Sequence, residues 1–402
     1  MANIEDRWTS PGMNGRRVAN ARHGSGSRWR ARYYDANGRQ HARHFDRKVD
    51  AQRWLDSVTT AVGTGSYVDP NRSKIAVGQV AEQWMAGKIN LKPTTRARYE
   101  NALEVHVLPR WAAVPLAAVE HGQIQAWLAE LTAAGQSGAS VRKIHGVLSA
   151  VLDLAVRDRR IPANPARGAS LPRARLRRRR YLDAGQVELL AIEAATPPRT
   201  GTANAAGYRA NGLAVLVLAY CGLRWSELAA LRVDHVDLLH RRLIIREAVT
   251  EINGGRLVWG TPKSHEARLV PLPAFLVDEL TAHLAGRSAR DLVFTTVNGD
   301  VLRNRNARRS WFDRSTEAIG QPGLTPHELR HTAASLAVSS GANVKAVQRM
   351  LGHASAAMTL DIYADLFESD LDAVAARLDE TRAAAKDWIR TGGRNVYRMS
   401  RD

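Results

Sequence analysis

The chain has 402 residues, enough for two or three domains and a sizeable core. Its 58 basic and 39 acidic side chains leave a formal charge of +19, which favours a polyanionic partner, nucleic acid first and an anionic membrane second. The single cysteine, Cys221, excludes an internal disulfide framework and a cysteine-rich zinc site, and it fits a reducing cytoplasm. No apolar run is long enough to span a bilayer, and no signal-peptide core is found.

The first segment, residues 1 to about 27, is rich in Gly, Ser, Asn and Arg and is expected to form a flexible basic arm. Alternating runs at 28–34 and 39–45 flank a turn at 35–38 and predict a hairpin, followed by a helix over 50–62. A small sheet backed by one helix suits a DNA groove. The alternative is a solvated sheet with incidental arginines. The candidate DNA contacts on this sheet are Arg30, Arg32, Tyr34, Arg39, His41 and Arg43.

Residues 63–73 contain Gly, Pro and Asn and are expected to form a linker. Helical patterns near 77–87, 94–105, 121–134 and 138–158 then predict a helical bundle. Polar and basic side chains near the helix starts are candidates for phosphate contact; these are Thr94, Thr95, Arg98, Arg142 and Lys143. For the two threonines that follow Pro93, a simple helix cap is the alternative.

The densest charge run in the chain, residues 173–180, follows the bundle. Such a run is usually a solvated linker; the second hypothesis is a basic strap across a duplex backbone, made by Arg177, Arg178, Arg179 and Arg180. Beyond it the pattern is of one large mixed domain. Helices are expected at 183–195, 207–221, 226–232, 272–285, 304–319, 326–340, 343–351 and 355–367, and strands at 243–249, 256–260, 268–271 and 292–295.

Two stretches of this domain carry cations in unusual places. Arg224 lies at a helix junction with a carboxylate, Glu227, three residues on; the simple alternative is a surface ion pair of little energetic value. Lys263 is expected at the tip of a hairpin. In a chain with 50 Arg and 8 Lys, a lysine there indicates that a proton-donating amine is wanted, because arginine does not deprotonate. The alternative is a turn lysine that serves solubility.

Two further stretches supply histidine and tyrosine. His327 and Arg330, three residues apart, share one face near a helix N-terminus, where an anion is favoured. His353 lies just past a helix end, and Tyr363 follows ten residues later. An unbroken helix would separate the last two by about 15 Å. Either a break near Ala354 folds the second helix back, or the tyrosine enters another subunit.

These residue types suit phosphoryl transfer without a metal. Arginines grip the non-bridging oxygens of a phosphodiester, and a tyrosine hydroxyl attacks phosphorus to become covalently attached. Its ordinary pKa of about 10 leaves roughly one hydroxyl in a thousand ionised at pH 7, so a nearby base is useful. No carboxylate cluster suited to two Mg²⁺ ions is apparent, and no cofactor is expected.

The order and residue types of these motifs resemble those of the tyrosine recombinase family, and within it those of the lambda-type phage integrases, which carry an added arm-binding domain. The matching motifs are Gly222-Leu-Arg-Trp-Ser-Glu227, Lys263 in its hairpin, His327-Glu-Leu-Arg330, Leu351-Gly-His353 and Tyr363. They follow in order with compatible spacing, and no catalytic position departs from the pattern. The resemblance also covers 74–165, which look like the helical core-binding domain, and more loosely 17–62, which look like the arm-binding domain.

The resemblance implies an α+β, multidomain fold with a small three-stranded sheet plus helix, a helical core-binding (SAM-like) bundle, and a mainly α catalytic domain with a small antiparallel sheet. The implied parts are a basic tail and arm-type domain at 1–66, the core-binding domain at 74–165, a basic linker at 166–182, the catalytic domain with its C-terminal tail at 183–390, and a flexible tail at 391–402. Within the C-terminal tail, 368–390 either packs against a neighbouring copy or finishes its own core; both remain open.

The resemblance also implies a role for each catalytic candidate. Tyr363 would be the nucleophile that forms a 3′-phosphotyrosyl link and releases a 5′ hydroxyl. Arg224 and Arg330 would clamp the scissile phosphate, and Lys263 would be the general acid. In supporting roles, His327 would assist proton transfer, His353 would hydrogen-bond the phosphate, and Glu227 would orient Arg224.

Members of the family act as tetramers on two DNA duplexes and exchange strands through a Holliday junction without ATP or metal. The expected partners are therefore double-stranded DNA with core-type and arm-type attachment sites and further copies of the chain, with an excision factor and a host DNA-bending protein as open candidates. The expected location is the cytoplasm of a bacterial host, at the nucleoid. Two rival functions stay open, a DNA-binding regulator without turnover and a DNA-relaxing topoisomerase. The complete residue set counts against the first, and the arm-like module counts against the second.

Overall fold

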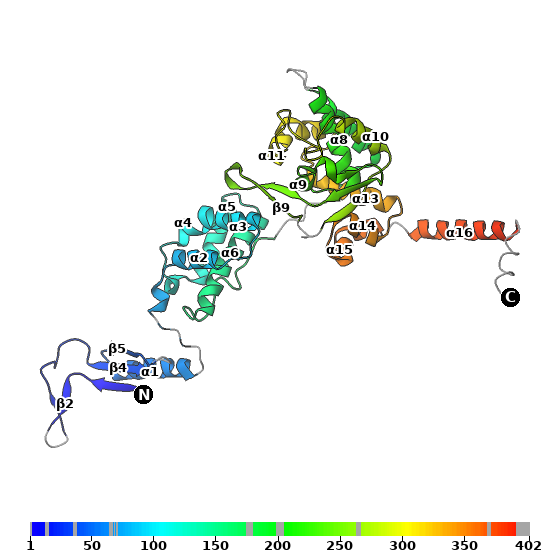
Figure 1. Cartoon of the computed structure of the whole chain (residues 1–402). Helices are drawn as coiled ribbons and strands as arrows, with labels where there is room; N and C mark the ends of the chain where they lie inside the picture. The colour runs from blue at the N-terminus through cyan, green and yellow to red at the C-terminus, as the bar shows by residue number, and fades with distance from the viewer. Residues whose placement is uncertain are drawn as a thin grey trace. The chain divides into compact units, whose positions relative to one another are not determined.

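A computed structural model of the chain describes residues 2–12, 16–34, 38–63, 67, 69, 71–173, 180–197, 205–262, 267–367 and 371–390. These residues belong to two compact units, Met1–Leu176 and Arg177–Asp402, whose elements are labelled in Figure 1. Over this described part of the chain, no helix combines the length and the apolar character needed to cross a membrane. The fold is of the mixed α+β kind, with helices and small antiparallel sheets.

The first unit begins with a three-stranded antiparallel sheet in the order β1–β4–β5, packed on one helix. Alternation along β4 places Ala31 and Tyr33 toward the helix, where they are buried with Ala51 and Leu55. The bounds are β1 Asn3–Asp6, β4 Trp29–Tyr34, β5 Gln40–Phe45 and α1 Lys48–Gly63, with a separate two-stranded pair, β2 Thr9–Pro11 and β3 Arg17–Ala19.

The expectation of a flexible arm over residues 1–27 is wrong where the structure describes this segment, because it supplies three strands. The carboxylate of Asp6, 8 % exposed, accepts hydrogen bonds from the guanidinium of Arg28 at 2.9 Å and from the Thr9 hydroxyl at 2.9 Å. The bond from Arg28 outweighs burial and lowers the pKa of Asp6 to about 2. A composition rich in glycine and arginine suggests disorder, whereas this ion pair between distant residues orders the segment. Of the expected turn at 35–38, residues 35–37 lie outside the described residues.

A helical bundle completes the first unit. Its elements are η1 Arg72–Lys74, α2 Val77–Ala86, α3 Pro93–Ala102, η2 Leu103–Val107, α4 Leu108–Trp111, η3 Leu116–Ala118, α5 His121–Ala133 and α6 Gly138–Arg157. Trp111 and Trp127 meet edge to face in its core, with ring centroids 5.9 Å apart. The start of the expected linker at 166–182 is tied to this bundle, because the amide of Ser170 donates to the Gln125 side chain at 2.8 Å.

The second unit is built around α8, whose residues Gly212 to Ala219 are all buried. A helix that is apolar on every side needs neighbours all round, and α7, α10 and α13 pack against it. The helices of this unit are α7 Ala184–Ala195, α8 Ala205–Cys221, α9 Trp225–Leu228, η4 Val233–His235, η5 Asn253–Gly255, α10 Phe275–Leu284, α11 Asn304–Ala307, η6 Arg308–Phe312, α12 Asp313–Ala318, α13 Pro326–Ser339, α14 Val344–Leu351, α15 Ala356–Phe367 and α16 Leu371–Trp388.

The strands of the second unit form two small antiparallel sheets. One has the order β10–β7–β6, made of β6 Val236–Asp237, β7 Arg242–Ile245 and β10 Arg268–Pro271; the other pairs β8 Ala248–Glu251 with β9 Leu257–Gly260. The single strand expected at 243–249 is therefore two strands in different sheets. The strand expected at 292–295 is wrong, because only isolated bridges occur there. Its apolar residues are buried without a partner strand, Val293 donating its amide to Leu231 and Phe294 stacking on His283.

We expect Gly212→Ala to weaken the contact between α7 and α8. A Cβ at this position would lie 2.6 Å from the backbone oxygen of Ala191, so the two helices must move apart. The overpacking should outweigh the better helix propensity of alanine and lower the free energy of unfolding by about 1–2 kcal/mol, measured by urea denaturation. Gly185→Ala in α7 is the matched control, because its nearest neighbour would be 3.4 Å away. Equal stability of the two variants would contradict the prediction.

Candidate active site

Arg224 lies at the junction of two helices. α8 ends at Cys221, and Gly222 then takes a left-handed backbone (φ +67°) that turns the chain toward α9. A Cβ at Gly222 would lie 2.7 Å from Leu351 Cδ2, so the turn requires glycine. The turn leaves Arg224 immediately before α9 with its side chain partly buried, in the junction that the sequence predicted.

The carboxylate of Glu227 holds this arginine in place. It is 1 % exposed and accepts hydrogen bonds from Arg224 Nη1 at 2.7 Å and from the Arg224 amide at 2.8 Å. On its other side it accepts from Arg268 Nη1 at 2.8 Å and Nη2 at 2.6 Å. Burial alone raises the pKa of a carboxyl, but the hydrogen bonds and charges of the two arginines outweigh it and hold the pKa of Glu227 at about 2. Glu227 is therefore a permanent anion that fixes one face of Arg224.

Arg268 is a residue that the sequence analysis missed. It begins β10, and besides its two bonds to Glu227 it donates from Nε to the backbone oxygen of Met350 at 3.1 Å. Its side chain passes over Gly352, where a Cβ would lie 2.7 Å from Arg268 Cδ. In a chain with 50 arginines, an arginine at the start of a strand carries no signal of its own. Only the contacts reveal that it joins α9, β10 and the end of α14.

Arg330, on α13, supplies a second cation. It is 2 % exposed, and its guanidinium donates to the backbone oxygens of Gly222, at 2.6 Å, and Leu351. Burial, together with the positive charges of Arg224 and Arg268, lowers the pKa of Arg330 to about 9, so it stays charged at neutral pH. Because its hydrogen bonds go to carbonyl groups rather than to a carboxylate, its charge is available to an anion.

Tyr363 lies near these side chains, and the cluster is made up of Arg224, Glu227, Arg268, Arg330, His331, His353 and Tyr363. α15 departs from helical geometry at this residue (φ −128°, ψ 18°), and the ring is 1 % exposed. The hydroxyl is hydrogen-bonded to His331 Nδ1 at 2.8 Å, and the ring of His353 stacks on the tyrosine ring with centroids 6.2 Å apart. Gly352 caps α14 in a left-handed conformation (φ +64°) and turns the chain back. Of the two expected alternatives, the structure therefore has the folded-back helix within one chain.

The two predicted histidines have different surroundings. His353 Nδ1 is hydrogen-bonded to the Thr359 hydroxyl at 3.0 Å. Burial and the positive charges of Arg330 and Arg224 lower the pKa of His353 to about 4, so its ring is neutral at pH 7. His327 is exposed, and its ring meets that of His331 edge-on with centroids 5.1 Å apart. His331 was not among the residues predicted from the sequence, although it directly follows Arg330.

A groove with a volume of about 740 Å³ opens beside the cluster. Arg224 and His327 line it on one side, the hairpin β8–β9 lines another, and Arg303 to Arg305 complete it. Arg303 is fixed by Glu251 at 2.7 Å, and the Trp225 indole donates to the Leu302 oxygen at 3.2 Å. The groove is thus bordered by cations and hydrogen-bonding groups, as a phosphate backbone requires.

Other candidates of the catalytic domain are not brought to this cluster by the described residues. Lys263 lies outside them, between β9 and β10 in the sequence, and so do Arg177, Arg178 and Arg179. Arg180 is described, and it donates to Glu328 at 3.2 Å and to the Pro322 oxygen at 2.9 Å within its own unit. Where the chain is described, no three His, Cys, Asp or Glu side chains gather as they would around a metal ion.

The candidates on the N-terminal sheet divide between its two faces. Arg30, Arg32 and Tyr34 alternate with the buried residues of β4, so they share the face away from α1. His41 stacks on Tyr33, with centroids 5.1 Å apart, on the face that α1 covers. On that same face Arg43 lies over the Phe45 ring, and Arg39 is exposed just before β5.

The candidates on the bundle lie at helix starts. Thr94 and Thr95 follow Pro93 inside the first turn of α3, whose N-cap residue is Lys92, so neither threonine is the helix cap. Arg98 is exposed on the same helix. Two further exposed basic residues, Arg142 and Lys143, lie in the first turns of α6; Arg142 donates to the Pro172 oxygen at 2.9 Å.

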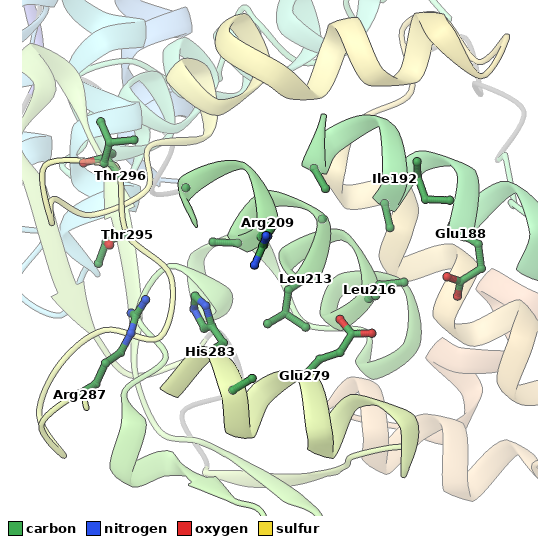
Figure 2. Close-up of a pocket in the computed structure, with 17 residues that line it drawn as sticks. Glu188, Ile192, Arg209, Leu213, Leu216, Glu279, His283, Arg287, Thr295 and Thr296 are labelled. Carbon is green, nitrogen blue, oxygen red and sulfur yellow. The ribbon is translucent and has the colours of Figure 1, made fainter. Parts of the chain in front are cut away.

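A second pocket, between α7, α8 and α10, has a different character. Figure 2 shows Glu188 from α7 and Glu279 from α10 among the residues that line it, together with Leu213 and His283. Burial and the charge of Glu188 raise the pKa of Glu279. None of the residues proposed for catalysis lines this pocket, where the two carboxylates are accompanied by Arg209 and Arg287.

The Glu227 network leads to a prediction about acid stability. The pKa of Glu227 is about 2 in the fold against an ordinary 4.5, so its contribution is full above about pH 4.5 and is lost as the pH falls toward 2. We expect Glu227→Gln to unfold about 3 kcal/mol more easily at pH 7, with a difference that shrinks on acidification, measured by urea denaturation. Glu251→Gln, which loses the more exposed pair with Arg303, should cost less than about 1 kcal/mol. A loss at Glu227 that is independent of pH would contradict the prediction.

Comparison with known proteins identifies both parts of the chain that carry these features. Residues 180–369 match the phage integrase family, and residues 77–170 match the phage integrase central domain. A prophage phiRv2 integrase of Mycobacterium tuberculosis is 29% identical over 359 residues, which cover 86% of this chain and 91% of that protein.

Solved structures show the same fold. The Tn1549 transposon integrase in complex with a circular intermediate DNA has a TM-score of 0.62 at 20% identity, over 71% of this chain and 94% of that one. The lambda integrase tetramer bound to a Holliday junction has a TM-score of 0.51 at 17% identity, over 87% and 96%. The chain belongs to the tyrosine recombinase (phage integrase) family and is a site-specific recombinase.

Proposed function

We propose that this recombinase cuts and rejoins DNA through a 3′-phosphotyrosyl intermediate at Tyr363 and a Holliday junction, and so integrates a prophage or other mobile element at attachment sites. The observation that carries the proposal is the position of the Tyr363 hydroxyl, held by an imidazole inside a cluster that contains the buried cation Arg330. Arg330 donates to the backbone oxygen of Leu351, two residues before His353, whose ring stacks on that of Tyr363.

The proposed chemistry assigns one task to each side chain. Arg224 and Arg330 bind the non-bridging oxygens of the scissile phosphate and neutralise its charge in the transition state. The oxygen of Tyr363 attacks phosphorus, forming the tyrosyl bond and breaking the bond to the 5′ oxygen, which Lys263 protonates. His353, neutral at pH 7, donates a hydrogen bond to the phosphate from Nε2, since Nδ1 is engaged with Thr359. The reverse reaction, by a 5′ hydroxyl of the partner duplex, reseals the strand without ATP.

The remaining proposals concern DNA and assembly. The solved relatives were captured with DNA, one as a tetramer on a Holliday junction, which supports a homotetramer on two duplexes. Residues 1–66 form an arm-type DNA-binding domain, 74–165 bind core sites, and 183–390 carry catalysis. Core contacts come from Thr94, Thr95, Arg98, Arg142 and Lys143, with a strap at 177–180. The protein acts in the host cytoplasm at the nucleoid, with an excision factor and a DNA-bending protein as accessory partners.

Tyr363→Phe should abolish the covalent protein–DNA adduct on a nicked, trapped core-site substrate and leave DNA binding intact, because only the attacking oxygen is removed. The adduct is measured on denaturing gels with EDTA present, and the wild type should form it. Tyr220→Phe is the matched control, since that hydroxyl donates a hydrogen bond to Glu188 Oε1 at 3.4 Å, on α7 and away from the cluster. An adduct formed equally by Tyr363→Phe would refute the assignment. Relaxation of a plasmid without any attachment site would favour a topoisomerase instead.

The face of the N-terminal sheet away from α1 gives a second test. Arg30→Ala should weaken binding to arm-site DNA and lower the slope of log affinity against log salt by about 1, because one phosphate contact is lost. Arg47→Ala is the control, since that side chain is 76 % exposed beyond the sheet, next to Asp50. Affinity is measured by fluorescence anisotropy at several salt concentrations. Equal losses in the two variants would show that general charge, and not this face, carries the contact.

A further inference from the structure

The nucleophile of the proposed reaction touches a histidine that has no role in the scheme above. His331 Nδ1 lies 2.8 Å from the Tyr363 hydroxyl, and the two rings are inclined at 63° with centroids 5.6 Å apart. His331 is partly buried on α13, directly after Arg330, while Tyr363 comes from α15. The contact therefore joins the segment that carries one arginine of the clamp to the segment that carries the tyrosine.

The other two histidines are placed less well for the same proton. His353 offers its ring face to Tyr363, at an interplanar angle of 9°, and its Nδ1 is engaged with Thr359. His327 is exposed one helical turn before His331, and its ring meets that of His331 edge-on. His331 presents a ring nitrogen to the phenolic oxygen at 2.8 Å, a distance suited to proton transfer.

We propose that His331 is the catalytic base that takes the proton from the Tyr363 hydroxyl as its oxygen attacks phosphorus, a role that rests on the function proposed above. The neutral imidazole carries its hydrogen on Nε2 and accepts at Nδ1. As the bond from the tyrosine oxygen to phosphorus forms, the O–H electron pair stays on oxygen and the proton moves to Nδ1. The departing 5′ oxygen takes a separate proton from the general acid. The proton stays on Nδ1 and returns to the tyrosine oxygen when a 5′ hydroxyl displaces it and the strand is resealed.

The environment of His331 matches this task. The groups that face it are His327 from its own helix, Tyr363 from α15 and His353 from the turn before α15, and Arg330 precedes it directly on α13. During attack the phosphate brings negative charge to the same cluster, which stabilises the protonated ring when it forms.

The test measures the rate of adduct formation by three forms of the full chain. His331→Ala should slow cleavage at pH 7 by about 10²–10⁴-fold, and its rate should then rise about tenfold per pH unit toward pH 9, because only ionised phenol attacks without a base. His331→Asn keeps a hydrogen-bond acceptor for the hydroxyl but takes no proton, so it should remain as slow as the alanine variant. A substrate with sulfur as the 5′ leaving atom, which departs without protonation, should rescue neither variant.

Controls separate this role from folding and from the proposed function. His240→Ala removes an exposed histidine of the same unit that pairs with Asp237, and it should cleave like the wild type. Core-site affinity and thermal unfolding report whether each variant keeps its fold. Wild-type cleavage by His331→Asn, a His331→Ala rate within a few-fold of wild type, or rescue by the sulfur substrate would overturn the assignment while Tyr363 remains the nucleophile. Failure of the wild type to form any adduct would overturn the proposed function itself.

Discussion

One buried carboxylate organises the catalytic unit. A charge inside a protein is tolerated only when partners replace the water it has lost, and Glu227 meets this demand with guanidinium groups on two sides. One of them belongs to Arg224, which the site needs at the edge of the groove; the other belongs to Arg268, whose remaining donor reaches the end of α14. The need to satisfy a single anion thus locks together α9, β10 and the turn that leads to His353.

In the rest of the cluster, the guanidinium groups that carry charge are distinct from the imidazoles that contact the tyrosine. Arg330 is buried against carbonyl groups, and its hydrogen bonds go to them rather than to a carboxylate. Burial, together with the charges of Arg330 and Arg224, lowers the pKa of His353 to about 4 and keeps its ring neutral at physiological pH. Two imidazoles contact the tyrosine, His331 through Nδ1 and His353 through its ring face. In the reaction proposed above, this arrangement lets a phenol with an ordinarily high pKa act at neutral pH.

Much of the architecture could be predicted from short-range patterns. Local signals predict three of its features. Gly222 marks the junction before Arg224, Pro326 marks the N-terminal turn of α13, and Gly352 marks the break between α14 and α15. Contacts between distant residues could not be predicted. Arg268 and His331 look like ordinary residues until the fold brings them to Glu227 and Tyr363, and the strand β1 depends on Asp6 meeting Arg28. The apolar run at 292–295 misled because burial in a loop and burial in a strand give the same pattern.

The glycine of the Leu351-Gly-His353 motif has a consequence for how such chains diverge. Its missing side chain leaves the space through which Arg268 reaches two other segments, and its left-handed backbone already disfavours any replacement. The two positions should therefore change together over evolution. A relative that carries a larger residue at this turn is expected to have given up the strand arginine as well, and to neutralise its buried glutamate from some other direction.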